Sequence, residues 1–154
     1  MLREYRMYHS LEEGFNLTGV VDRVDDVGGE LVVIDYKSGK GPTLKYSDQV
    51  NERIMHDKFF QLKVYALLLQ ARINRLPTQL QLIYLDGPTK YVMRISEDQV
   101  SKAEIELKSQ CTDVSMALDT DNFPTKPGKI CNWCSFKSIC PAWNSTTGSG
   151  WVGQ

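Results

Sequence analysis

Residues 19–39 read GVVDRVDDVGGELVVIDYKSG. Two runs rich in valine and isoleucine, which favour β-strands, lie on either side of Gly28 and Gly29. Adjacent glycines are typical of a two-residue hairpin loop, because type I′ and II′ turns need positive φ angles that glycine adopts at little cost. The sequence therefore predicts an antiparallel hairpin with strands at roughly 15–25 and 30–36.

The register of this hairpin determines which side chains face one another. With the glycines in the loop, Val27 pairs with Glu30, and each step outward continues the pairing until Asp22 faces Asp35. Their Cβ atoms are then about 5 Å apart. Lys37 lies two residues beyond Asp35, so it projects from the same face of the sheet.

The opposed pair of Asp22 and Asp35 has two interpretations. Two carboxylates among valines and isoleucine are costly unless a cation joins them, and a hard divalent cation such as Mg²⁺ prefers such oxygen ligands. Alternatively, both acids face solvent at the rim of the sheet, and Lys37 is their salt-bridge partner. The residues of the hairpin alone leave both interpretations open.

Apolar spacing, turn residues and a capping box predict the remaining elements. In chain order they are an edge strand near 4–8, a loop at 37–43, a helix beginning near Ser47 or Asp48, a stronger helix at about 57–74, strands at 79–85 and 90–95, and a helix from a Ser96/Gln99 capping box to about Leu118. This order predicts an α/β fold, with a mixed sheet flanked by helices.

The composition sets limits on the kind of protein. The 154 residues suffice for one hydrophobic core, and a net charge of −1 neither favours nor excludes nucleic acid. There is no apolar run of about 20 residues and no apolar N-terminal stretch, so we expect a cytoplasmic protein without a membrane span. We predict a core at 1–122, a cysteine-rich segment at 123–141 packed on it, and a flexible tail at 142–154.

Three motifs together resemble the PD-(D/E)XK nuclease superfamily. Residues 19–25 resemble its GxxDR strand, residues 35–39 its DYK(T/S)G strand, and residues 61–65 its QxxxY helix. The motifs occur in this order and in the expected strand, strand and helix contexts. The resemblance covers roughly residues 4–141 and points to the RecB-like branch, which includes CRISPR-associated exonucleases.

The resemblance implies a restriction-endonuclease-like core and a metal-dependent deoxyribonuclease. Asp22, Asp35 and the backbone carbonyl of Tyr36 would bind Mg²⁺ or Mn²⁺. Lys37 would be the catalytic lysine, acting on the attacking water and on the charge of the scissile phosphate.

Further residues take roles only through the resemblance. Gln61 and Tyr65 lie four apart on one helix face and would organise the site, whereas without the other motifs they are an ordinary helix edge. Family members usually have an upstream helix that contributes a polar residue, and no matching stretch occurs here. Glu4 would occupy the acidic position that some members have on the preceding strand and would be a metal ligand. A protein partner or a missing N-terminal segment would otherwise complete the site. His9 and His56 match no motif.

The function implied is an exonuclease in phage, repair or CRISPR-associated DNA processing. Single-stranded DNA is the expected partner, with contacts from Lys40, Lys45, Tyr46 and Lys63. The alternative is a catalytically reduced DNA-binding or assembly subunit that keeps the nuclease fold. The motif residues Asp22, Asp35 and Lys37 favour catalysis, whereas the missing upstream helix favours the alternative.

Three of the four cysteines lie within ten residues, in the pattern CxxCxxxxxCP. Such spacing of Cys131, Cys134 and Cys140 is typical of iron–sulfur or zinc sites. In iron–sulfur members of the family, three cysteines so spaced join one from upstream of the nuclease motifs, which this chain lacks. The resemblance therefore implies a 4Fe–4S cluster, with zinc as the alternative. Cys111 is either a fourth ligand or a core residue on its apolar stripe.

Overall fold

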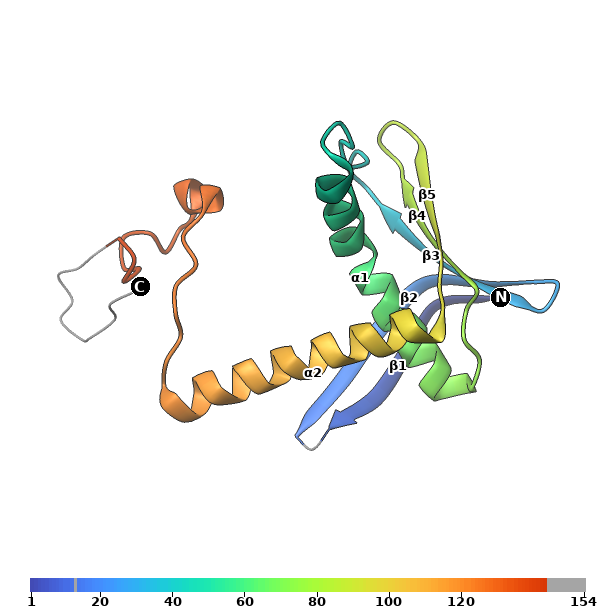
Figure 1. The fold of residues 1–154 in the computed structure, drawn as a ribbon, viewed down its shortest axis with the longest axis horizontal. Helices are drawn as coiled ribbons and strands as arrows, with labels where there is room; N and C mark the ends of the chain where they lie inside the picture. Colours follow the sequence, from blue (N-terminus) through green and yellow to red (C-terminus); the bar gives the residue numbers. More distant parts are fainter. Residues whose placement is uncertain (13, 144–154) are drawn as a thin grey trace. The chain divides into compact units, whose positions relative to one another are not determined.

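The computed structural model describes residues 1–12 and 14–143 (Figure 1). The elements in chain order are β1 (Leu2–Glu12), β2 (Phe15–Val27), β3 (Glu30–Lys37), α1 (Asp48–Ile73), β4 (Gln79–Tyr84), β5 (Thr89–Arg94), α2 (Glu97–Thr120) and the 3-10 helix η1 (Lys129–Trp133). The chain forms two compact units, Met1–Cys111 and Thr112–Gln154, with the boundary inside α2. Residues 144–154 of the predicted tail lie outside the described residues.

The first unit is built on one five-stranded sheet, in which the strands follow one another in sequence order. Three neighbouring pairs are antiparallel, and β3 pairs with β4 in parallel. A parallel pair needs a crossover, which α1 provides between these two strands (Figure 1). The predicted α/β fold with a mixed sheet and flanking helices is confirmed.

The β2–β3 hairpin has the predicted turn and register. Gly28 and Gly29 have φ angles of 63° and 90°, as a type I′ turn requires. Pairing runs from Val27 and Glu30 as far as Arg23 and Ile34. Asp22 and Asp35 follow directly after the last pair, where β2 and β3 part.

Helix α1 is a single helix, so the prediction of two separate helices was wrong. Residues 51–58 are mostly exposed and carry no apolar stripe, but they contain no glycine or proline to end the helix. The helix ends at Ile73, where Asn74 adopts a left-handed conformation and donates its N–H to the Gln70 carbonyl at 3.0 Å.

The hydrophobic core lies between α1 and the sheet. The helix contacts β1, β2, β3 and β4. The core residues are apolar side chains on one face of the helix and on the strands beneath it. They include Met7, Val21, Val24, Val33, Phe59, Leu62, Ala66, Leu69, Leu80 and Leu82. This packing fixes the middle of α1 over the end of the β2–β3 hairpin.

Helix α2 begins at the predicted capping box. Gln99 donates its N–H to the Ser96 hydroxyl at 3.4 Å, and Ser96 donates its N–H to the Gln99 side chain at 3.1 Å. Val100 and Ala103 are buried, and Cys111 packs partly buried against the core. Among the described residues, no helix is long and apolar enough to cross a membrane.

Candidate active site

Asp35 is a buried carboxylate near the end of the central strand β3. It is only 3% exposed, because β2 and β4 flank its strand and α1 covers its face. Its Oδ2 lies 2.7 Å from Nζ of Lys37, but this ion pair lacks hydrogen-bond geometry. Within the described residues, Oδ2 of Asp35 therefore has no hydrogen-bond partner. Burial raises the pKa of Asp35, the Lys37 charge opposes this shift, and the Asp22 charge adds to it.

Asp22 is brought to Asp35 where the ladder between β2 and β3 ends. Its Oδ2 accepts a hydrogen bond from the Tyr36 N–H at 2.8 Å. The side chain of Asp22 thus binds a backbone group of β3 at the point where regular strand pairing has stopped. Two carboxylates and the backbone of Tyr36 therefore meet at one place, as the hairpin register predicted.

Lys37 connects this pair of acids to helix α1. Its Nζ, on a side chain that is about one-third exposed, donates to Oε1 of Gln61 at 2.8 Å. Nε2 of Gln61 in turn donates to the hydroxyl of Tyr65 at 2.6 Å. A chain of polar contacts runs from Asp35 through Lys37 and Gln61 to Tyr65, so these helix residues are not an ordinary solvated edge.

Gly19 allows α1 to lie this close to the hairpin. A Cβ at this position would lie 2.8 Å from Cδ1 of Leu68 and 3.0 Å from Cε1 of Tyr65. Any larger residue would therefore push against the ring whose hydroxyl accepts from Gln61. Gly19 is the first residue of the GxxDR-like motif at residues 19–25. The close approach of α1 explains why this position holds a glycine.

Tyr84 and Tyr91 flank the site and were missed by sequence reasoning. Tyr84 pairs with Lys37 across the parallel strands and is buried. Burial raises the pKa of Tyr84, while the charge of Lys37 opposes the shift. Its ring lies 5.9 Å from that of Tyr91, edge to face. The alternating pattern of β4 predicts an inward Tyr84, but its parallel register with β3 has no local sequence signal.

The donor set fits a hard divalent cation held partly by water. Asp22 and Asp35 provide carboxylate oxygens, and the carbonyl of Tyr36 lies next to them in the chain. The buried Oδ2 of Asp35, which has a charged neighbour but no hydrogen bond, is the kind of oxygen that a cation satisfies. The described residues contain no group of three or more histidine, cysteine, aspartate or glutamate side chains able to hold a metal. Mg²⁺ commonly binds through one or two carboxylates and several waters.

Glu4 lies alongside Asp22 but is not gathered into the site. Its neighbours Arg3 and Tyr5 pair with Arg23 and Val21, so the register puts Glu4 beside Asp22. The residue is exposed and has a φ of 46°, which is uncommon for a residue other than glycine. Its role as a metal ligand stays a prediction.

The cysteines are not gathered in the structure. All four are free thiols. The N–H of Gly128 donates to Sγ of Cys131 at 3.3 Å. Among the described residues, which include all four cysteines, no group of three or more histidine, cysteine, aspartate or glutamate side chains is placed to hold a metal. A cluster or zinc site at these cysteines therefore stays a prediction. Cys111 packs against the core, as its apolar stripe suggested.

Lys63 does not belong to a DNA-binding surface, so that expectation was wrong. The residue is only 6% exposed, because it lies among the apolar residues of α1. Burial lowers the pKa of Lys63, and the Glu106 charge from α2 opposes the shift. In contrast, Lys40, Lys45 and Tyr46 are all exposed.

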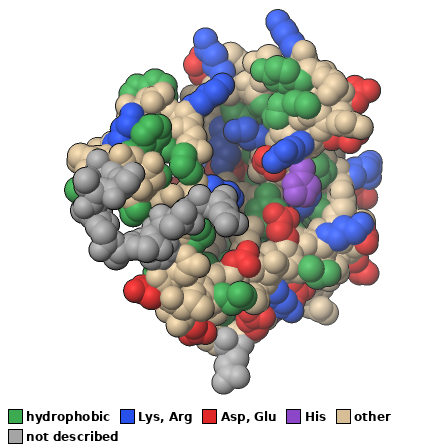
Figure 2. Space-filling model, turned by 60° about the vertical axis from the view of Figure 1, so that its left-hand side comes forward, with side chains coloured by type: hydrophobic (Ala, Val, Ile, Leu, Met, Phe, Trp, Pro, Cys, Tyr) green, Lys and Arg blue, Asp and Glu red, His purple; other side chains and the backbone are tan. Residues whose placement is uncertain are grey.

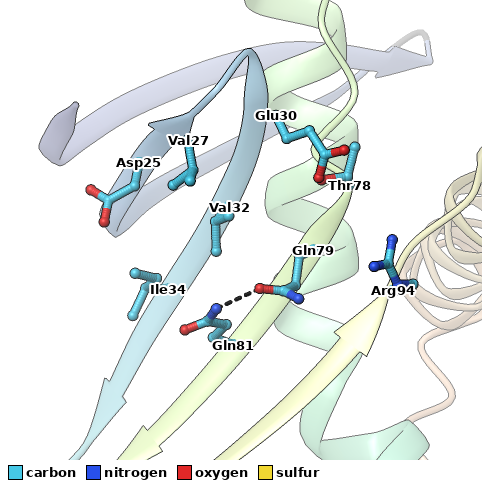
Figure 3. Close-up of a pocket in the computed structure, with 9 residues that line it drawn as sticks. All are labelled: Asp25, Val27, Glu30, Val32, Ile34, Thr78, Gln79, Gln81 and Arg94. Carbon is cyan, nitrogen blue, oxygen red and sulfur yellow. Dashed lines mark hydrogen bonds between the residues drawn. The ribbon is translucent and has the colours of Figure 1, made fainter.

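The opposite face of the sheet has a different character. A hollow of about 320 Å³ there is lined by residues of β2 to β5 and by Thr78 (Figure 3). Val32 and Ile34 form its apolar part, and Nε2 of Gln81 donates to Oε1 of Gln79 at 2.6 Å. Val32 and Ile34 alternate along β3 with Val33 and Asp35, so this hollow lies behind the carboxylate site and shares none of its groups.

The charges on the surface are mixed. Figure 2 shows acidic and basic side chains interspersed over one face of the molecule. This agrees with a net charge of −1. A nucleic-acid contact would therefore depend on a local arrangement of basic residues and not on a uniformly positive surface.

Comparisons with known proteins bear on this arrangement. A family model described as the PD-(D/E)XK nuclease superfamily matches residues 2–141. A solved structure described as the crystal structure of SSO0001 is similar at a TM-score of 0.50 and 18% sequence identity, over 93% of this chain and 60% of that one. At 18% identity, this similarity shows the fold alone. The chain spans about 60% of the length of the solved structure that it matches. The comparison with curated proteins found no match.

Proposed function

Since the chain belongs to the PD-(D/E)XK nuclease superfamily, we propose that it hydrolyses DNA phosphodiester bonds at the Asp22, Asp35 and Lys37 site. The observation that carries this proposal is the continuous set of contacts from Asp35 through Lys37 to Gln61. A lysine held between a carboxylate and an amide oxygen has a defined position for its positive charge. Such preorganised charge is what stabilises the transition state of phosphate hydrolysis.

Nucleases of this superfamily typically use Mg²⁺ or Mn²⁺. Asp22, Asp35 and the Tyr36 carbonyl would hold the ion, which when bound supplies positive charge to the phosphate and acidifies water. Nζ of Lys37 would donate to a phosphate oxygen or to the attacking water. Gln61 acts as a positioning residue for Lys37, because its amide oxygen accepts from Nζ at 2.8 Å.

We further propose an exonuclease of the RecB-like type that acts on single-stranded or end-bearing DNA. The three motifs in residues 19–65 support this narrower assignment. A catalytically reduced DNA-binding or assembly subunit is the alternative, and the retained acids and lysine favour catalysis over it. The close-spaced cysteines are proposed only as a structural site, outside the hydrolytic chemistry.

A nuclease assay tests the proposal. The protein is incubated with single-stranded and duplex DNA in the presence of Mg²⁺ or Mn²⁺, with EDTA as the metal-free control and Lys37→Ala as the matched variant. We expect cleavage that EDTA and the variant both abolish. DNA binding without cleavage under every metal condition would favour the non-catalytic alternative.

A further inference from the structure

The loop between β3 and α1 leads directly away from the proposed catalytic lysine. Residues 38–47 follow Lys37 without interruption and carry Lys40, Lys45 and Tyr46, but no acidic residue. All three of these side chains are exposed, and Tyr46 is 59% exposed. A loop that carries an exposed tyrosine ring and two exposed lysines has the composition of a single-strand binding surface.

One anchor holds the middle of this loop against β5. The hydroxyl of Tyr91 donates to the Pro42 carbonyl at 3.2 Å. A Cβ on Gly41 would lie 3.1 Å from the Tyr91 ring, so the loop backbone packs closely on that ring. The loop is therefore seated on the sheet at this point.

A second anchor fixes the backbone of Tyr46 itself. Nδ2 of Asn51 donates to the Tyr46 carbonyl at 2.9 Å, and Oδ1 of Asn51 accepts from the Tyr46 N–H at 3.3 Å. Both polar backbone groups of Tyr46 are thus bound by one side chain from the first turn of α1. The ring projects from a fixed backbone, which lowers the entropy cost of using it to bind a ligand.

Helix geometry gives the spacing between this ring and the catalytic site. Gln61 contacts Lys37 and lies about 20 Å along α1 from Asp48, at about 1.5 Å per residue. Tyr46 lies two residues before Asp48, next to the N-cap residue Ser47. A strand whose phosphate lies at Lys37 would therefore reach Tyr46 only several nucleotides away.

From this arrangement we propose that the loop at 38–47 is a binding site for single-stranded DNA, in which Tyr46 stacks on an unpaired base and Lys40 and Lys45 contact phosphates. The inference rests on the proposed function and names the part of the chain that holds the substrate strand. Stacking requires a base that is free of its partner, so it favours a single strand over an intact duplex. Two lysines give only a modest dependence on salt.

Binding measurements without cleavage test this inference. Fluorescence anisotropy of labelled single-stranded oligonucleotides in EDTA compares the parent with Tyr46→Ala, Tyr46→Phe and Tyr8→Ala. Tyr8 is the matched control, because it is 61% exposed and lies on β1. We expect Tyr46→Ala to weaken binding about 10-fold, and both Tyr46→Phe and Tyr8→Ala to stay within about twofold of the parent.

The length of the oligonucleotide provides an internal check. The effect of Tyr46→Ala should be absent for oligonucleotides too short to reach from Lys37 to Tyr46 and should appear above a threshold length. Equal binding by the parent and Tyr46→Ala at every length would overturn the inference, while cleavage by the parent would leave the proposed function intact. Equal weakening on blunt duplex would contradict base stacking. A parent that neither binds nor cuts DNA would refute both proposals.

Discussion

The hairpin site of the first unit and the cysteine segment of the second unit both stand out in the sequence, but only the first is assembled in the structure. Asp22, Asp35 and Lys37 are held by strands whose backbones are paired, and Gln61 is held by a long helix packed on the core. The cysteines lie in the 3-10 helix η1 and in turns closed by local hydrogen bonds, such as the Cys140 N–H to the Lys137 carbonyl at 3.4 Å.

The difference follows from what positions the side chains. Within the described residues, the buried apolar side chains all precede residue 104, so the core supports the first site alone. A cysteine-rich turn without a core commonly gains its order from the metal it binds. A site built on strands and a helix can be complete before its ligand arrives, whereas a metal-dependent turn cannot.

The largest expected effect comes from removing a charge from the assembled site. Asp35→Asn or Lys37→Ala should reduce metal-dependent cleavage at least about 100-fold, because each removes charge that acts on the transition state. Initial rates on a labelled oligonucleotide measure this effect, and circular dichroism checks the fold.

Asp25→Asn is the matched control for that substitution. Asp25 also pairs with a basic residue, Arg23 at 2.7 Å, but lines the hollow on the opposite face of the same hairpin. We expect its cleavage rate to stay near that of the parent. An equal loss in both aspartate variants would show that the hairpin's ion pairs matter for folding and not specifically for catalysis.

A smaller effect is expected from disturbing the packing behind the site. Gly19→Ala puts a methyl group against Leu68 and Tyr65, and overpacking of this kind costs about 1–3 kcal/mol of stability. Since the methyl group also displaces Tyr65, we expect the cleavage rate to fall about 10-fold, which corresponds to an activation free energy raised by about 1.4 kcal/mol.

Thermal unfolding and kcat are measured together. Gly128→Ala is the control, because a Cβ at Gly128 meets no neighbour within 4 Å. A Gly19→Ala protein of parental stability and rate would show that α1 has room to move.

Removing a single hydroxyl sharpens the comparison further. Tyr65→Phe keeps the buried ring but loses the oxygen that accepts from Gln61 at 2.6 Å. A hydrogen bond of this kind contributes about 1 kcal/mol, so we expect about a fivefold fall in kcat. KM should not change, because the hydroxyl positions Lys37 through Gln61. A change confined to KM would instead place Tyr65 in substrate binding.

These contrasts also show which features could be predicted from the sequence. The turn at Gly28 and Gly29 sets the register by local chemistry, so the approach of Asp22 to Asp35 followed from the residues alone. The continuous helix through residues 51–58 was not predicted. Most of these residues are exposed, so they lack the helical spacing of apolar residues on which the prediction relied, although the backbone hydrogen bonds of the helix continue through them.

Other features depend on contacts between distant segments and had no local signal. The buried Lys63 of α1 lies near Glu106 of a second helix, α2. The position of Tyr84 depends on parallel pairing across the α1 crossover. The hydroxyl contact from Tyr91 to Pro42 likewise joins strand β5 to a loop far away in the chain. Such features belong to the tertiary structure and not to any motif.

The smallest expected effect on catalysis comes from the cysteine segment. If Cys131, Cys134 and Cys140 bind a 4Fe–4S cluster or zinc, protein purified without oxygen should contain that metal, and a cluster should colour it brown. Cys134→Ser should lose the metal and make residues 123–141 more sensitive to protease, because the metal then supplies their order. The cleavage rate should stay within about twofold of the parent rate, since the catalytic groups are held by the sheet and α1.

Cys111→Ser tests whether Cys111 is the fourth ligand. Loss of metal would assign Cys111 to the site, and retention of metal would leave it a core residue. Metal analysis showing neither iron nor zinc, with all four thiols freely titratable, would exclude such a site and leave the hairpin as the only metal site proposed for this chain.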